Sequence, residues 1–223
     1  MKSITLKAAN VKETISVQFG EKILSEGFSY KKAGNEFRRQ NESYTYIFNI
    51  DQAAWIDSYS LHVRLYISQK QIEDTLEKII GKLRHKLTIG NDIGRIYKSP
   101  DGREIVNGDL SIWIRQDEDV KAAIESLEWY YTDIAKPYFK RYQTLESIDD
   151  IINNAPFDHC PANVGGNFDE RCMKGLIAAR LVNNPVYEKL VAIYDEAIKQ
   201  TMNNESIENY YKVKDYLMYN RIK

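Results

Sequence analysis

The only residues in this chain arranged like metal ligands lie in one irregular segment. Asp158, His159 and Cys160 are adjacent, and Cys172 follows twelve residues after Cys160. Thiolates and imidazole are good zinc ligands. However, the chain has no Cys-x-x-Cys or His-x-x-x-His pair, so ordinary buried or surface cysteines are the simpler interpretation. We therefore expect neither a metal nor another cofactor.

Hydrolytic chemistry would require a base within reach of a nucleophile. The three histidines fall in different settings: His62 in a predicted strand, His85 near a predicted helix end and His159 in a predicted loop. Paired carboxylates at 117–119 and 149–150 lie at predicted helix starts, where the helix dipole explains them. The sequence therefore predicts no catalytic residue. A small-molecule-binding or hydrolytic enzyme whose site combines residues distant in sequence is the alternative.

The segment at 61–67 alternates in character, as a strand with one buried face does. Leu61, Val63, Leu65 and Ile67 fall on one face, and His62, Arg64 and Tyr66 fall on the other. A later segment, 110–115, alternates in the same way. The polar and aromatic residues of the two segments converge if the strands are neighbours, and these residues are His62, Arg64, Tyr66, Trp113 and Arg115.

Arginine and large aromatic residues are enriched in protein interfaces. We therefore interpret this residue set as a partner-binding face. Charged residues at 31–32 and 38–39 would extend the face or protect an edge strand with charge. In the alternative arrangement, helices cover the face and Tyr66 and Trp113 belong to the core.

Periodicity predicts an α+β fold built on an antiparallel sheet of five to six strands. Strands are expected at 36–39, 44–50, 61–67, 93–98, 103–106 and 109–115. Loops are expected at 51–60 and 90–94, and Asn107-Gly108 is a strong hairpin signal. Gly34-Asn35 should form a turn or bulge before the first of these strands.

Apolar residues at helical spacing predict a helix over 11–26 and another over 72–87, capped by Ser68 and packed with the first on one face of the sheet. A third should begin at 117–119 and end before Pro137. Further helices are expected at 147–154, 170–182, 185–202 and 205–221. This pattern divides the chain into a sheet domain at 1–155 and a helical extension at 156–223.

The region from about 12 to 155 resembles an uncharacterised bacterial family known only as a domain of unknown function. A helix is followed by Gly27-Phe28, then by a Lys-Lys-x-Gly-Asn-x-Phe segment over 31–37 with Arg39 close behind, and then by aromatic strands. The resemblance implies a bacterial, intracellular setting and the same fold. It transfers no catalytic residue.

Composition excludes several classes of function. The chain has 223 residues, of which 43% are hydrophobic and 28% charged, and its net charge is −1. Such a charge balance predicts no general attraction to nucleic acid or to an anionic membrane. No segment is long and apolar enough to span a bilayer, so we expect a cytoplasmic protein. The remaining expectation is a non-enzymatic module that binds a protein partner, by analogy an immunity protein, with oligomeric state undetermined.

Overall fold

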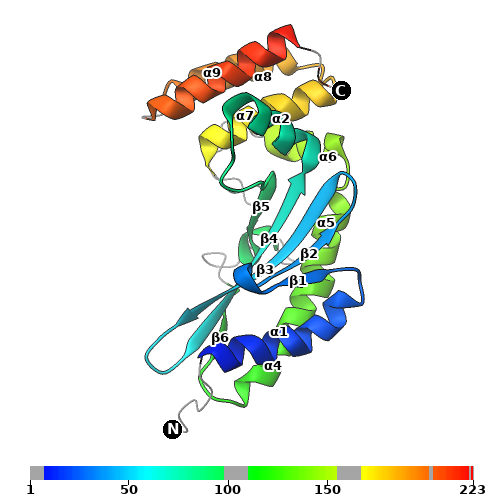
Figure 1. The fold of residues 1–223 in the computed structure, drawn as a ribbon, viewed down its shortest axis with the longest axis vertical. Helices are drawn as coiled ribbons and strands as arrows, with labels where there is room; N and C mark the ends of the chain where they lie inside the picture. Colours follow the sequence, from blue (N-terminus) through cyan, green and yellow to red (C-terminus); the bar gives the residue numbers. More distant parts are fainter. Residues whose placement is uncertain (1–7, 98–109, 155–166, 201–202, 221, 223) are drawn as a thin grey trace. The chain divides into compact units, whose positions relative to one another are not determined.

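The computed structural model describes residues 8–97, 110–154, 167–200, 203–220 and 222. Within these residues the fold is α+β, with a six-stranded, mostly antiparallel sheet and a helical C-terminal region, as predicted (Figure 1). The strands are β1 (Ser29–Lys31), β2 (Glu36–Gln40), β3 (Tyr44–Ala54), β4 (Tyr59–Gln69), β5 (Ile89–Asp92) and β6 (Ile112–Ile114).

The helices before the C-terminal region include one short 3₁₀ helix and one π-helical segment. They are α1 (Ala8–Leu24), η1 (Lys32–Gly34), α2 (Lys70–Ile80), α3 (Ile93–Ile96), α4 (Asp119–Trp129), η3 (Tyr130–Ala135) and α5 (Lys136–Arg141). The C-terminal region contains α6 (Leu145–Asn153), α7 (Phe168–Leu181), α8 (Tyr187–Ile198) and α9 (Asn204–Tyr219).

The strands follow the order β1-β2-β3-β4-β5, and β6 pairs with β4 as well. β1 and β2 are joined by the expected turn, in which Asn35 adopts the left-handed conformation with φ of 48°. β6 runs antiparallel to the beginning of β4, with Ser60 opposite Trp113. This pairing brings residues more than 50 positions apart in the chain onto one sheet surface.

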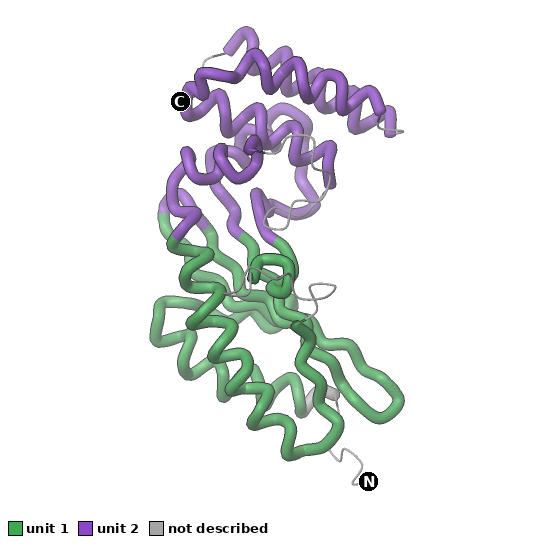
Figure 2. Tube along the Cα trace, turned by 180° about the vertical axis from the view of Figure 1, so that it is seen from behind, with its two compact units in different colours: residues 1–41, 45–66, 91–140 green, residues 42–44, 67–90, 141–223 purple. Residues whose placement is uncertain are grey.

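Close contacts divide the chain into two compact units, each discontinuous in sequence (Figure 2). Unit 1 consists of Met1–Asn41, Thr45–Tyr66 and Asn91–Lys140. Unit 2 consists of Glu42–Tyr44, Ile67–Gly90 and Arg141–Lys223. These units follow from contacts in the folded chain. The predicted boundary between a sheet domain at 1–155 and a helical extension at 156–223 came from the sequence pattern, and it stays a prediction.

The core of unit 1 is rich in aromatic residues because α1 packs its apolar stripe on the inner face of the sheet. The ring of Phe19 lies 5.3 Å from that of Phe37, 5.2 Å from that of Phe48 and 6.4 Å from that of Tyr131. Phe19 and Tyr131 are almost completely buried. Edge-to-face and tilted pairs of this kind add to the free energy gained by burying the rings.

The core of unit 2 is built around α7, which contacts α2, α6, α8 and α9. Inside it lies a buried ion pair: Lys174 Nζ is 3.0 Å from Glu73 Oε1 and also donates to the backbone oxygen of Leu87 at 2.7 Å. Thr88 Oγ1 donates to the same Glu73 oxygen at 2.7 Å. Burial raises the pKa of Glu73, and the ammonium of Lys174 opposes that rise.

Helix α2 differs from the prediction at both ends. Gln69, rather than Ser68, is the N-cap, and its side chain accepts a hydrogen bond from the backbone N–H of Ile72 at 2.8 Å. The helix ends at Ile80 rather than at 87, because Gly81 adopts φ of 91°, which is incompatible with a right-handed helix. Its main contacts are with α7 and α9 and not with the sheet.

Three further local predictions were wrong. The predicted loop at 90–94 contains most of β5, and the segment predicted as a strand from Ile93 begins α3 instead, because Asp92 accepts a hydrogen bond from Gly94 N and caps that turn. The predicted loop at 51–60 is mostly strand, since β3 continues to Ala54 and β4 begins at Tyr59. The segment at 103–106 and Asn107-Gly108 lie outside the described residues.

Pro137 does not end the helix before it. The helical path runs from α4 through the π-helical segment η3 into α5, where Pro137 is the second residue. Proline lacks an N–H and clashes with the carbonyl four residues earlier in a regular α-helix. The wider π turn directly before Pro137 removes that regular spacing, so the helix continues.

The buried ion pair of unit 2 yields a stability prediction. Lys174→Met should lower the free energy of unfolding by about 3 to 5 kcal/mol, because the carboxylate of Glu73 is then buried without its cation. Urea denaturation followed by circular dichroism measures this loss. Adding Glu73→Leu should restore part of it. Lys189→Met, at an exposed lysine, is the matched control and should shift the value by less than about 0.5 kcal/mol.

A loss as small as the control's would show that the pair contributes nothing to unit 2.

Candidate functional site

The five residues predicted to converge lie on one face of the sheet. Because Ser60 is opposite Trp113, the even-numbered residues of β4 and the odd-numbered residues around β6 point to the same side. His62, Arg64 and Tyr66 therefore share a surface with Trp113 and Arg115. The opposite face of β4 carries the buried set predicted from the sequence, which is Leu61, Val63, Leu65 and Ile67.

Two tryptophans dominate this surface. Trp113 is 43% exposed and Trp55, in the turn between β3 and β4, is 59% exposed. Their ring centroids are 5.9 Å apart at an interplanar angle of 36°. The guanidinium of Arg115 lies 5.9 Å from the centroid of Trp113, and Ile56 beside Trp55 is fully exposed. Large aromatic rings held in place by one another and open to solvent are typical of binding surfaces.

We call this surface the polar-aromatic face. It consists of Trp55, Ser60, His62, Arg64, Tyr66, Ser111, Trp113 and Arg115.

His62 ties three segments of the face together. Its Nε2 is 3.1 Å from Ser60 Oγ and its Nδ1 is 2.9 Å from Ser111 Oγ. Ser60 Oγ also accepts a hydrogen bond from Trp55 Nε1 at 3.1 Å. Because Ser60 is completely buried and its hydroxyl hydrogen needs an acceptor, the network is best satisfied when Ser60 donates to His62 Nε2, so that Nδ1–H donates to Ser111. These hydrogen bonds connect β4 both to the turn that contains Trp55 and to Ser111, which directly precedes β6.

The contacts of His62 with Ser60 and Ser111 raise the question whether these residues form a hydrolytic site. A serine nucleophile needs a base that accepts its proton, a third group that orients the base, and access to substrate. Ser60 is completely buried, and in the tautomer inferred above His62 donates to Ser111 instead of accepting from it. Both ring nitrogens of His62 face hydroxyl groups. The arrangement therefore serves to hold the strands together.

The charged and phenolic members of the face have defined partners. Arg64 forms an ion pair with Asp51 of β3, and both side chains are nearly half exposed. Burial raises the pKa of Tyr66, while the neighbouring guanidinium of Arg64 opposes the rise. Tyr66 is thus a neutral hydroxyl at physiological pH. The face offers aromatic area, cations and a phenol, which is a combination suited to a protein surface.

Sequence reasoning missed Trp55, Ser60, Ser111 and Asp51. Trp55 was assigned to a long loop, although its position just before a short turn between two alternating strands was a usable signal. The basic residues expected to extend the face have other partners in part: Arg38 pairs with Glu36 at 2.7 Å, and Arg39 lies 5.1 Å from the rings of both Phe28 and Tyr46.

The other candidate ligands and bases are accounted for as far as the structure describes them. Cys172 is completely buried in unit 2, and burial raises the pKa of its thiol to about 12. A thiol with so high a pKa is a poor metal ligand and a poor nucleophile. His85 is exposed after α2, outside any helix. His159 and Cys160 lie outside the described residues, among which no cluster of metal-binding side chains occurs.

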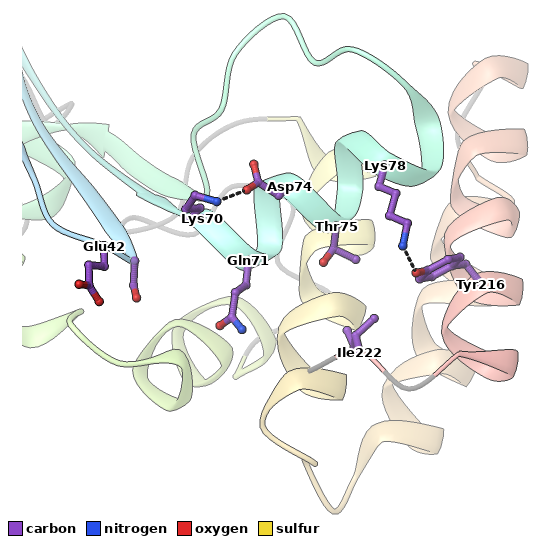
Figure 3. A pocket seen from close by; sticks show the side chains of 9 residues that line it. Glu42, Lys70, Gln71, Asp74, Thr75, Lys78, Tyr216 and Ile222 are labelled. Carbon is purple, nitrogen blue, oxygen red and sulfur yellow. Dashed lines mark hydrogen bonds and ion pairs between the residues drawn. The ribbon is translucent and has the colours of Figure 1, made fainter.

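Unit 2 also contains an open cavity of about 370 Å³ (Figure 3). One wall is α2, with Lys70, Gln71, Asp74, Thr75 and Lys78. The rest of the lining comes from Glu42 and Ser43 before β3, Tyr216 of α9, and Ile222. No sequence pattern predicts this cavity, because its walls come from three distant segments.

The fold and the face define an α+β protein with an exposed polar-aromatic face. Comparison with known families produced no match, and neither did comparison with characterised proteins or with solved structures. The resemblance to the uncharacterised bacterial family stays a prediction. In the part of the chain that is described, no helix combines the length and hydropathy needed to cross a membrane.

The burial of Cys172 predicts that its thiol is inert in the folded protein. In a Cys160→Ser variant, which leaves Cys172 as the only thiol, we expect less than about 5% labelling by a chromogenic disulfide reagent in native buffer, because the thiolate is both rare and inaccessible. Complete labelling is expected in 6 M guanidinium, which serves as the internal control. Rapid native labelling would contradict the buried position.

Proposed function

We propose that this chain is a non-enzymatic protein-interaction module of a bacterial cytoplasm, which binds its partner through the polar-aromatic face. The observation that supports the proposal is the exposed, tilted pair of Trp55 and Trp113, with the guanidinium of Arg115 near the second ring. Tryptophan and arginine account for a large share of the binding energy at protein interfaces.

The rigidity of the face supports the proposal further. Trp55 is held by its hydrogen bond to Ser60, and Trp113 is held by strand pairing and by its neighbour's ring. A binding surface that is already ordered loses little conformational entropy when its partner arrives. A protein that neutralises a partner by covering it, as immunity proteins do, would use a surface of this kind.

The test is affinity capture from native lysate with three tagged forms of the protein. Wild type should retain a stoichiometric protein partner. The variant with Arg64→Glu and Arg115→Glu should lose it, and so should Trp113→Ala, because the first reverses the cationic groups of the face and the second removes an exposed ring. Quantitative mass spectrometry of the eluates measures retention, and we expect a decrease of about tenfold or more.

The control reverses two charges elsewhere, at Arg84 and Lys140, both of which are exposed and lie outside the face. This Arg84→Glu, Lys140→Glu variant should retain the partner as wild type does. Thermal unfolding must show that all variants are folded. A partner retained equally by every folded form would place the interface elsewhere, and failure of wild type to retain any partner would count against an interaction module.

A further inference from the structure

The cavity of unit 2 has opposite charges at its two ends. Lys78 lies in its wall, and Lys78 Nζ is 3.0 Å from the hydroxyl of Tyr216 and 5.4 Å from the centroid of that ring (Figure 3). Glu42 lines the cavity near the start of α2, because the backbone N–H of Lys70 donates to Ser43 O at 2.8 Å and holds that segment there.

Both of these side chains are exposed, and neither forms an ion pair with another described residue. Lys78 has a phenol as its partner, and no carboxylate lies within 4.0 Å of its ammonium; Glu42 has no cation within that distance. The other acidic residue of the lining is already neutralised. Asp74 accepts from Lys70 at 2.7 Å and from Lys86 at 2.8 Å, and these hydrogen bonds lower its pKa.

Between the charged ends, one face of α2 presents polar groups. Gln71, Thr75 and Lys78 are spaced by four and then three residues, so they follow one another along the helix. The span from Gln71 to Lys78 is about 10 Å at 1.5 Å per residue. The side chain of Ile222 adds an apolar contact. The volume of the cavity lies in the range of small-molecule sites.

From this arrangement we infer that the cavity binds a short linear zwitterion, with the chemistry of a free tripeptide. Its carboxylate binds Lys78 and Tyr216, and its ammonium binds Glu42. A three-residue extended chain is about 10 Å long, which matches the span along α2. Inorganic phosphate fits less well, because it carries no cation to pair with Glu42 at the other end of the cavity.

The inference can be tested by titrating isotopically labelled protein with tri-alanine and following backbone amide signals by NMR. The signals of Gln71, Thr75 and Lys78 should shift and saturate. N-acetylated tri-alanine and tri-alanine amide each lack one charged end, so each should bind about tenfold more weakly. Inorganic phosphate should produce no saturable shift of these signals.

Two variants assign the ends of the ligand. Lys78→Met should abolish the preference for a free carboxylate over the amide, and Glu42→Gln should abolish the preference for a free ammonium over the acetylated form. The matched controls are Lys82→Met and Glu188→Gln, exposed residues that do not line the cavity, and both should retain wild-type preferences.

The results of the titrations either support or contradict binding of a tripeptide. Selective binding of the free tripeptide with both preferences lost in the expected variants supports it. Equal binding of phosphate or of the capped peptides would show a simple anion or apolar site and overturn it, and so would the absence of saturable shifts with tri-alanine. The experiment leaves the polar-aromatic face unchanged, so its failure and the failure of the interaction module are separate results.

Discussion

The antiparallel register between β4 and β6 is the constraint on which the polar-aromatic face depends. With Ser60 opposite Trp113, the ring of Trp113 lies on the same side as the even-numbered residues of β4, and the isoleucines of β6 join the core. Side chains alternate with a period of two, so a slip of one residue would bury Trp113 and expose Ile112 and Ile114. His62 reinforces this register because it bonds to Ser60 and Ser111 at once.

A histidine beside two serines looks at first like part of a catalytic site, but Ser60 is completely buried, so its hydroxyl group is not accessible to a substrate. Trp55 Nε1 already donates to Ser60, which leaves the serine hydrogen for the imidazole. The same network that engages both ring nitrogens of His62 also holds the exposed Trp55 in place. The order of the polar-aromatic face therefore depends on this one network in unit 1.

The two units use different chemistry. The polar-aromatic face of unit 1 is broad and presents ring surfaces, which suits a protein partner. The cavity of unit 2 is an open hollow with Lys78 and Glu42 in its lining, which suits a small molecule with both charges. Unit 2 also contains a buried ion pair between Lys174 and Glu73, whereas Lys78 and Glu42 are exposed at the cavity.

The sequence by itself determined the α+β class, the two faces of β4, and the positions of most helices. These features depend on hydrophobic periodicity and on helix-capping residues, and both signals come from residues close together in the sequence. It also placed the polar and aromatic residues on one side of each of two strands, and only tertiary pairing decided that these strands are neighbours. That the five residues bind a partner stays a prediction.

Local sequence patterns did not predict the structure where a backbone conformation or a contact with a distant segment decided it. A glycine such as Gly81 can lie within a helix or end it. Its positive φ, which ends α2, is a property of the folded chain. Pro137 was tolerated because the turn before it widened. The cavity of unit 2 and the Trp55 contact with Trp113 join segments far apart in sequence, so only the tertiary structure could bring their side chains together.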